Sequence, residues 1–370
     1  MNSIFLLTTF INPNPIMVVP GSIPNIMRSF AIFYGCRLLV VSIIYFQILK
    51  FSNLQIQLPT FVTMITIPHK AKQFSVFIIK LLIVTAAFYF IYDQLANNDK
   101  LDWVKFHSLL YDNQSISGTL FLLSFSFANR YLEILKWQNL VSLIKPISLG
   151  ESTKQVLGAL TAGIFTPNGL GEYAGKALYF DKKKTKKIIF LNLICNGIQM
   201  VLTVVFGTIG LLILGYWKWS LAIIGLSIFF ILFSFLFKNI KIKGYSIEKL
   251  IYKIKEIPKR IHTKNNLLAL CRYLVFSHQY YFLFLAFDVD LPYLTMMATI
   301  ATVYFLASSL PSFQFLDFAV KGSMAVFFFG KLGVNEWIAV FISTLMWFLN
   351  VVLPVVIGSY YVLKFKPKWE

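Results

Sequence analysis

Three pairs of oppositely charged side chains lie within strongly apolar parts of this sequence. They are Arg130 and Glu133, Glu172 and Lys176, and Asp317 and Lys321. Spacings of three or four residues place the members of each pair on one face of a helix, close enough for an ion pair. Because a charge at the centre of a bilayer costs about 2.5–3.5 kcal/mol, such residues usually face the protein interior and mark a pathway. In the alternative, each pair neutralises its own charge and serves helix packing alone.

Two of the pairs follow residues that break helices. Pro167 precedes Glu172 by five positions in "TPNGLGEYAGK", and Pro311 precedes Asp317 by six. A break exposes backbone groups that lipid cannot hydrogen-bond, so a broken membrane segment is surrounded by protein or lines a water-filled cavity. Two broken segments, one in each half of the chain, are typical of transporters with internal repeats. We expect the helix that begins near Gly169 to direct its positive end toward an anionic group such as a lipid phosphate.

The composition indicates that membrane-spanning helices position these residues. Of the 370 residues, 58% are hydrophobic and 13% are charged, and this charged share is about half of that in a soluble domain. A helix crosses a bilayer with about 20 apolar residues. Apolar runs near this length occupy 74–92, 117–137, 188–214, 217–237, 267–287, 293–310, 316–331 and 336–363. We predict an all-α fold, a polytopic transmembrane helical bundle of about eight spans, with re-entrant, Pro/Gly-broken segments in each half.

Basic residues predict which side each loop faces. The net charge is +19, and lysines gather in "DKKKTKK" (181–187) and in 238–264, which holds nine Lys and Arg residues. Cytoplasmic loops accumulate such residues. Two spans, 188–214 and 217–237, separate the loops, so both can be cytoplasmic, provided that 153–180 enters and leaves on that side. The basic C-terminus is expected there too, in a multi-pass protein of the cytoplasmic membrane.

Several other kinds of site are not indicated. The three cysteines, Cys36, Cys195 and Cys271, show no CxxC spacing and the histidines are scattered, so we expect neither disulfides nor a metal site. No nucleotide-binding motif or catalytic triad occurs, and we expect no cofactor and no catalytic residue. Basic and aromatic residues are not interleaved, which argues against nucleic acid. Lys136 and Trp137 favour the end of a span, where a long side chain reaches the membrane surface.

Residues 1–63 differ from the rest of the chain because they hold five prolines and no acidic residue. We treat them as an N-terminal extension and 64–370 as the transmembrane domain. Two interpretations of the extension are left open. It either adds one helix, over 31–49, or reflects a misplaced start, with the native chain beginning at Met64.

Four segments together resemble the lysylphosphatidylglycerol synthase transmembrane, or flippase-like, family. "LTAGIFTPNGLGEYAGKALYF" (160–180) is similar to the family's core of Thr-Pro, Gly-Glu and a base four residues later. "SSLPSFQFLDFAVKGSMAVFFF" (308–329) resembles its second conserved region, "WFLNVVLPVVIG" (347–358) its closing helix, and "NRYLEILKW" (129–137) its second helix. The resemblance covers the chain from Met64 onward.

The resemblance implies a transport protein, without catalysis of its own, that flips or exports a phospholipid or a lipid-linked glycan across the cytoplasmic membrane. The candidate headgroup-binding residues are Arg130, Glu133, Thr166, Pro167, Asn168, Gly169, Gly171, Glu172, Lys176, Asp317, Lys321 and Asn350. Lys176 and Lys321 depart from the family, where arginine is frequent, and a lysine cannot hold a phosphate through two parallel bonds. No aminoacyl-transferase domain is expected, so any synthase would be a separate partner protein.

Two other functions are left open. A membrane-embedded transferase acting on a lipid-linked substrate would need a donor site on a sizeable loop, whereas the loops here are short and lack a metal-binding acidic pair. A membrane scaffold would use the charged pairs for packing alone. The partners that we expect are an anionic phospholipid or lipid-linked substrate, and membrane lipids attracted to the basic loops. A homodimer is also left open.

Overall fold

The computed structural model describes residues 85, 116–164, 166, 169–236, 246–310 and 317–365. Throughout these ranges the regular structure is helical and no strand occurs. The all-α prediction is thus confirmed for the part of the chain that is described. Several predicted features lie outside it: the extension 1–63, the span 74–92 apart from residue 85, Pro167, Asn168, the break at Pro311, and residues 366–370.

The helices follow one another through short connections. Their bounds are α5 Ile116–Val141, α6 Leu149–Gly163, α7 Leu170–Ala177, η2 Lys182–Lys184, α8 Thr185–Ile213, α9 Trp217–Leu236, α10 Ile247–Lys255, α11 Lys259–Ala286, α12 Tyr293–Ser309, α13 Asp317–Gly330, α14 Glu336–Trp347, η4 Phe348–Val352 and α15 Leu353–Lys364. Helices α14, η4 and α15 follow without a gap and form one long rod, in which η4 is a π-helical stretch.

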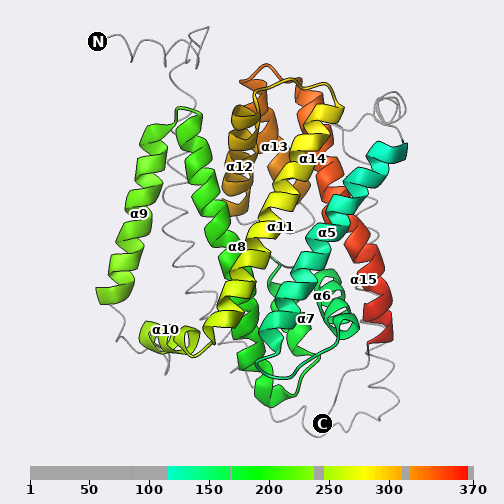
Figure 1. Ribbon diagram of the computed structural model, residues 1–370, viewed down its shortest axis with the longest axis vertical. Helices are drawn as coiled ribbons and strands as arrows, with labels where there is room; N and C mark the ends of the chain where they lie inside the picture. Colours follow the sequence, from blue (N-terminus) through cyan, green and yellow to red (C-terminus); the bar gives the residue numbers. More distant parts are fainter. Residues whose placement is uncertain are drawn as a thin grey trace, which may run out of the picture.

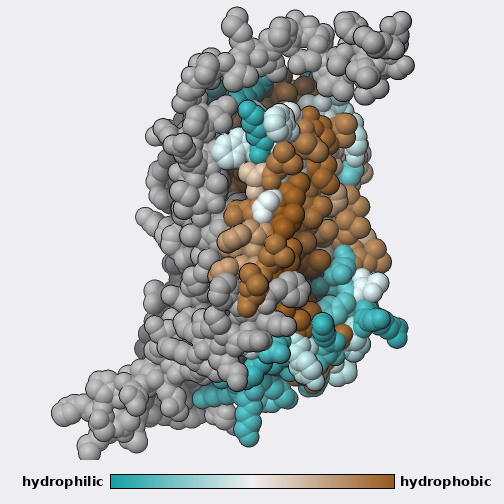
Figure 2. All heavy atoms as spheres, turned by 90° about the vertical axis from the view of Figure 1, so that its left-hand side faces the viewer, coloured by the Kyte–Doolittle hydropathy of each residue, from teal (hydrophilic) through white to brown (hydrophobic). Residues whose placement is uncertain are grey.

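Three of the described helical segments are long and apolar enough to cross a membrane, as in a multi-pass membrane protein. They cover Lys182–Ile213, Trp217–Ser234 and Glu336–Lys364. Helices α5 and α11 have 26 and 28 residues, about 39 and 42 Å at 1.5 Å per residue, but they carry charges. On the face that shows α9, apolar residues cover the middle and hydrophilic residues gather at both ends (Figure 2). A band of this kind suits lipid, which accepts apolar side chains that water does not.

One end of the molecule collects the basic segments. We call it the basic end and define it by η2, with Lys182–Lys184, and α10, with Lys249, Lys253 and Lys255, which belong to the two predicted basic loops. Helix α15 finishes at the same end, at Lys364 (Figure 1). Helices α8 and α9 lead away from the basic end and return to it. The prediction that these segments share one side is confirmed, and their cytoplasmic location stays a prediction.

Helices α6 and α7 form a hairpin that enters from the basic end and turns back inside the molecule (Figure 1). They have 15 and 8 residues, about 22 and 12 Å, so neither spans the roughly 30 Å of hydrocarbon in a bilayer. Glycines allow the two helices to touch. A Cβ on Gly163 would lie 2.6 Å from the backbone N of Glu172, and one on Gly171 would lie 2.9 Å from Gly163 Cα. The close approach therefore depends on small residues, as in other membrane helix pairs.

Helices α12 and α13 form a second hairpin, which enters from the opposite end (Figure 1). They have 17 and 14 residues, about 26 and 21 Å in length. The apolar runs predicted at 293–310 and 316–331 thus form the two helices of one hairpin, and the prediction that they re-enter the membrane stays a prediction. Helix α12 is at the lower limit of about 17 residues for a membrane span, and α13 is below it.

Apolar side chains pack into two main clusters, one toward each end of the molecule. The larger cluster joins α8, α11, α12, α13 and α14 and is rich in aromatic residues such as Phe284, Phe305 and Phe329. The smaller one lies near the basic end, around Trp137 and Leu191 of α5 and α8. The charged residues of α5, α7, α11 and α13 that line the cavity described below lie between the two clusters.

Candidate functional site

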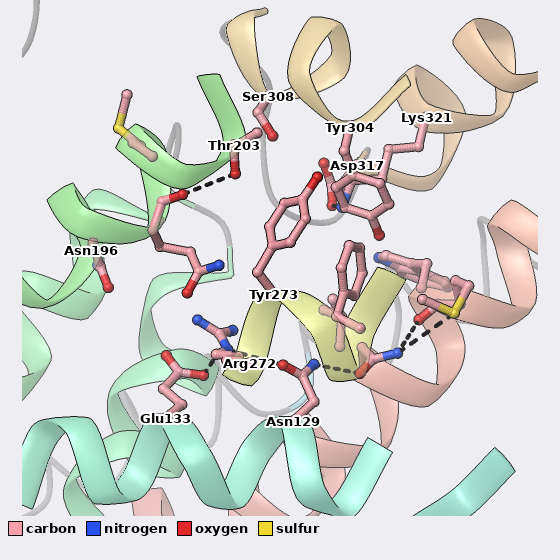
Figure 3. A pocket seen from close by; sticks show the side chains of 18 of the residues that line it. Asn129, Glu133, Asn196, Thr203, Arg272, Tyr273, Tyr304, Ser308, Asp317 and Lys321 are labelled. Atoms are coloured by element: carbon pink, nitrogen blue, oxygen red, sulfur yellow. Dashed lines mark hydrogen bonds and ion pairs between the residues drawn. The ribbon is translucent and has the colours of Figure 1, made fainter. Parts of the chain in front are cut away.

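A cavity of about 360 Å³ lies between the two hairpins, lined by Gly169 and Glu172 of the first and by Ser308 and Asp317 of the second. Three basic and three acidic side chains line it: Arg130, Glu133, Glu172, Arg272, Asp317 and Lys321. Glu133 and Arg272 lie on one side of the cavity and Asp317 and Lys321 on the other, with Tyr273 between them (Figure 3). The six charged residues that line this polar space balance in formal charge, but Lys176 pairs with Glu172 from outside the lining, so the whole group has one positive charge in excess.

The first group of charges joins α5 to α11. Arg130 donates to its predicted partner Glu133, one helical turn along α5. Arg272 comes from α11, and its Nη2 lies 3.2 Å from the same Glu133 Oε2. The Nε of Arg272 donates to Asn129 Oδ1 at 2.9 Å. One carboxylate therefore contacts two guanidinium groups, and this cluster carries one net positive charge.

Amide side chains extend this cluster across three helices. Asn129 donates to Asn350 Oδ1 at 2.6 Å, and Asn350 in turn donates to Gln279 Oε1 at 2.9 Å. Gln279 is fully buried and donates to Ser126 Oγ at 2.6 Å. Because each amide has its partner, the chain of hydrogen bonds fixes the orientation of the side chains beside the arginines.

Asn350 also holds Arg130 through its backbone. The Nη2 of Arg130 donates to the Asn350 carbonyl oxygen at 2.6 Å. Asn350 lies in the π-helical stretch η4, and Pro354 follows it by four residues. Proline has no N–H, so in a regular helix it would leave the carbonyl four residues earlier without a donor. The guanidinium donates to this carbonyl within a π-helical stretch, where the backbone pairing already departs from that of a regular helix.

The second pair, Glu172 and Lys176, lies on α7. Lys176 Nζ donates to Glu172 Oε1 at 2.6 Å and to Asn192 Oδ1 at 2.8 Å, and it lies 4.8 Å from the ring centre of Trp137. Lys176 is fully buried, whereas Glu172 lines the cavity. The lysine therefore acts on the cavity through the carboxylate that it holds, and its predicted contact with a headgroup stays a prediction.

The third pair, Asp317 and Lys321, lies on α13 across the cavity. Lys321 donates to Asp317, and its Nζ lies 4.5 Å from the ring centre of Tyr304. The two side chains are 22% and 17% exposed, more than those of the Glu172 pair at 9% and 0%. This pair is therefore the more accessible of the two hairpin pairs. All three ion pairs predicted from residue spacing are confirmed.

The residues of "TPNGLGEYAGK" that are described shape the tip of the first hairpin. Thr166 Oγ1 donates to the Gly163 carbonyl at 2.6 Å and accepts from the Gly171 N–H at 2.7 Å. Gly169 lines the cavity and has a φ of 67°, a left-handed conformation that favours glycine. Because Thr166 already occupies one free N–H of α7, the start of this helix offers fewer donors to an anion than the sequence predicts.

The structure thus brings seven of the predicted residues to the cavity: Arg130, Glu133, Gly169, Glu172, Asp317, Lys321 and Asn350. Thr166, Gly171 and Lys176 support the first hairpin instead. Sequence reasoning missed Arg272, although it lies within a predicted span and the rule that singled out Arg130 applies to it equally. It also missed Asn129 and Gln199, which carry no charge to mark them.

One sequence interpretation of this region is wrong. Lys136 and Trp137 do not lie at a membrane surface, since both are fully buried. Lys136 Nζ donates to the Cys195 carbonyl at 2.9 Å, and Trp137 Nε1 donates to Gln155 at 2.7 Å. Helix α5 continues to Val141, because α6, α7 and α8 cover this part of it.

Fold and site together define a helical multi-pass membrane protein with a charged internal cavity between two opposed hairpins. Comparisons with protein-family models, curated proteins and solved structures find no match for this chain. Any narrower function must therefore be argued from the cavity and from the residue pattern itself.

Proposed function

We propose that this protein moves the headgroup of an anionic phospholipid or lipid-linked glycan between the leaflets of the cytoplasmic membrane. The observation that carries the proposal is the cavity at the meeting point of two half-length hairpins that enter from opposite ends. Polar, broken segments at membrane depth are tolerated where they line such a space, and transporters use them to form substrate sites near the midplane.

The size and lining of the cavity support a headgroup as its occupant. A volume of about 360 Å³ falls in the range of about 300–1,000 Å³ for small-molecule sites. Arginine side chains bind phosphate with several directed N–H groups, and Arg130 and Arg272 both line the cavity. Acyl chains would stay in the bilayer, beside the apolar surface that α8 and α9 expose.

The family resemblance supports the same proposal. Glu172 and Asp317 occupy its two motifs, one on each hairpin, and both line the cavity. In this proposal the acids hold the neighbouring bases in place or contact a cationic part of the headgroup. The arginines and Lys321 attract the phosphate.

A transport assay with Glu172→Gln tests the proposal. The purified protein is placed in lipid vesicles, and the movement of fluorescent phospholipids between leaflets is followed by quenching of the outer leaflet. The variant loses the charge that holds Lys176, so we expect transport to fall by about tenfold, the effect of one charge-assisted hydrogen bond of roughly 1.5 kcal/mol. The control is Asp181→Asn, which removes the acid of an exposed ion pair on η2.

Two results would contradict the proposal. One is lipid movement in wild-type vesicles no faster than in protein-free vesicles across phospholipid and lipid-linked glycan probes. The other is unchanged movement in Glu172→Gln when gel filtration shows an intact protein. Formation of a labelled glycolipid from a nucleotide sugar and membrane extract would favour a transferase instead.

A further inference from the structure

The two halves of the chain build the same four-part unit in opposite directions. The first unit consists of the long helix α5, the hairpin α6–α7 and the long helix α8. The second consists of the long helix α11, the hairpin α12–α13 and the rod α14–η4–α15. Helix α5 runs toward the basic end and α11 runs away from it, and the two hairpins enter from opposite ends (Figure 1).

The packing between the two units is reciprocal, because the hairpin of each unit contacts the last helix of the other. Helix α6 of the first hairpin packs on α15, where a Cβ on Gly358 would lie 2.2 Å from Thr161 Oγ1. Helix α12 of the second hairpin packs on α8, where a Cβ on Gly207 would lie 2.1 Å from Phe305 Cβ. Each hairpin is therefore held by the last helix of the other unit, at a glycine in both cases. This is the arrangement of an inverted repeat, whose pseudo-twofold axis lies in the membrane plane.

The repeat makes Arg130 and Arg272 counterparts. Arg130 precedes the first residue of α6, Leu149, by 19 positions, and Arg272 precedes the first residue of α12, Tyr293, by 21. Both line the cavity and both contact Glu133 Oε2. The axis that relates the units thus passes near the one carboxylate that the two guanidinium groups share.

We propose that Arg130 and Arg272 form one phosphate-binding site, to which each repeat contributes one arginine. This deepens the proposed lipid transport and rests on it for the nature of the substrate. The cluster has one positive charge in excess, because a single carboxylate faces two guanidinium groups. An uncompensated buried charge is costly, and a phosphate anion would compensate it.

Unused donors at the cavity support the same ligand. Among the described residues, the buried Nε of Arg130 and the buried Nε1 of Trp347 have no hydrogen-bond partner. Trp347 is 3% exposed and lines the cavity. Buried donors of this kind are rare in proteins and call for a partner, which phosphate oxygens can provide.

A site on the axis has a consequence for transport. If the two hairpins exchange their conformations, α5 and α11 exchange environments, and the pair of arginines is preserved. A headgroup can then stay bound at one point while access to it changes sides, as in other transporters built from inverted repeats.

The test compares two fluorescent lipids in vesicles that contain the full chain: phosphatidylglycerol, which has a phosphate, and glucosylceramide, which has none. We expect Arg130→Gln and Arg272→Gln each to slow phosphatidylglycerol movement by about tenfold to a hundredfold, the range of charge-assisted hydrogen bonds. Movement of glucosylceramide should change less than threefold. Arg272→Lys keeps the charge and should lose less than Arg272→Gln. The matched control is Arg260→Gln, an exposed arginine on the same helix.

A binding measurement separates this site from the transport proposal. Dihexanoyl phosphatidylglycerol is titrated into the detergent-solubilised protein by calorimetry, and each Gln variant should weaken binding by about tenfold or more. If Arg272→Lys and Arg272→Gln both bind the probe with the same affinity as wild type, the proposed site is wrong, whether or not wild type moves lipid. If wild type binds the probe through both arginines but moves no lipid, the phosphate-binding site is supported and the transport proposal is wrong. If the Gln variants slow the movement of both fluorescent lipids equally, the arginines serve packing and the proposed site is wrong.

Discussion

Replacing Glu133 by glutamine should be among the most destabilising isosteric changes in the described part of the chain. Its carboxylate contacts Arg130 on its own helix and Arg272 on α11, at 3.2 Å for the second. The side chains of Arg130 and Arg272 are 12% and 20% exposed. Removing one partner of a buried ion pair costs about 3–5 kcal/mol, because the remaining charge is left without compensation. Here two charges are left, so we expect the upper part of that range.

The measurement is the free energy of unfolding of the purified protein in mixed micelles, from titration with sodium dodecyl sulfate. The control is Asp181→Asn, whose partner Lys184 lies 3.0 Å away in a pair that is 45% and 62% exposed. Exposed pairs contribute about 0–1 kcal/mol. The double variant Glu133→Gln and Arg272→Gln removes one of the two uncompensated charges and should recover part of the loss. If Glu133→Gln differs from the control by less than about 1 kcal/mol, Glu133 does not compensate the two arginines.

Two further predictions concern the first hairpin and the basic end. Gly171→Ala should destabilise the protein by about 1–3 kcal/mol in the same titration, the cost of overpacking, because its Cβ would lie 2.8 Å from Thr166 Cγ2. The control is Gly225→Ala, whose Cβ would meet nothing within 4 Å, and it should cost less than about 0.5 kcal/mol. Equal effects of the two variants would contradict the close packing of α6 and α7. The second change replaces the exposed α10 lysines, Lys249, Lys253 and Lys255, by glutamine. It should reduce the number of anionic lipids that remain bound in native mass spectrometry, because each basic residue near a membrane attracts them by roughly 1 kcal/mol. An unchanged number would contradict this role.

Local pairs were predictable from the sequence, and distant ones were not. A spacing of three or four residues is enough to predict an ion pair within one helix, and all three predicted pairs occur. The contact between Glu133 and Arg272 joins helices that are far apart in the chain. No spacing rule relates them, because their distance depends on how α5 packs on α11. The same holds for the amide chain from Asn129 to Gln279.

Hydropathy predicted where helices lie but not how far they cross. The break in "TPNGLGEYAGK" was visible because glycine and proline mark it, and the structure places the turn between α6 and α7 there. Helices α12 and α13 are about as apolar as α8, so an average over residues could not predict that they pair as one hairpin. Lys136 illustrates the opposite error. A lysine near the end of an apolar run usually reaches water, but neighbouring helices extend past it here.

The depth of the cavity follows from the lengths of the hairpin helices. Helices of about 12–26 Å are shorter than the roughly 30 Å of hydrocarbon in a bilayer, and in our proposal both hairpins therefore turn back within the membrane. The turns carry backbone groups that lipid cannot satisfy. Two hairpins that enter from opposite ends can both shield their polar groups from lipid where they meet. Charged residues placed there share one polar space. Arg130 at the η4 carbonyl and Thr166 at the α7 amide satisfy such groups directly. In this proposal the fold itself requires part of the polar lining, and the positive charge in excess beside Glu133 is the part that a ligand would explain.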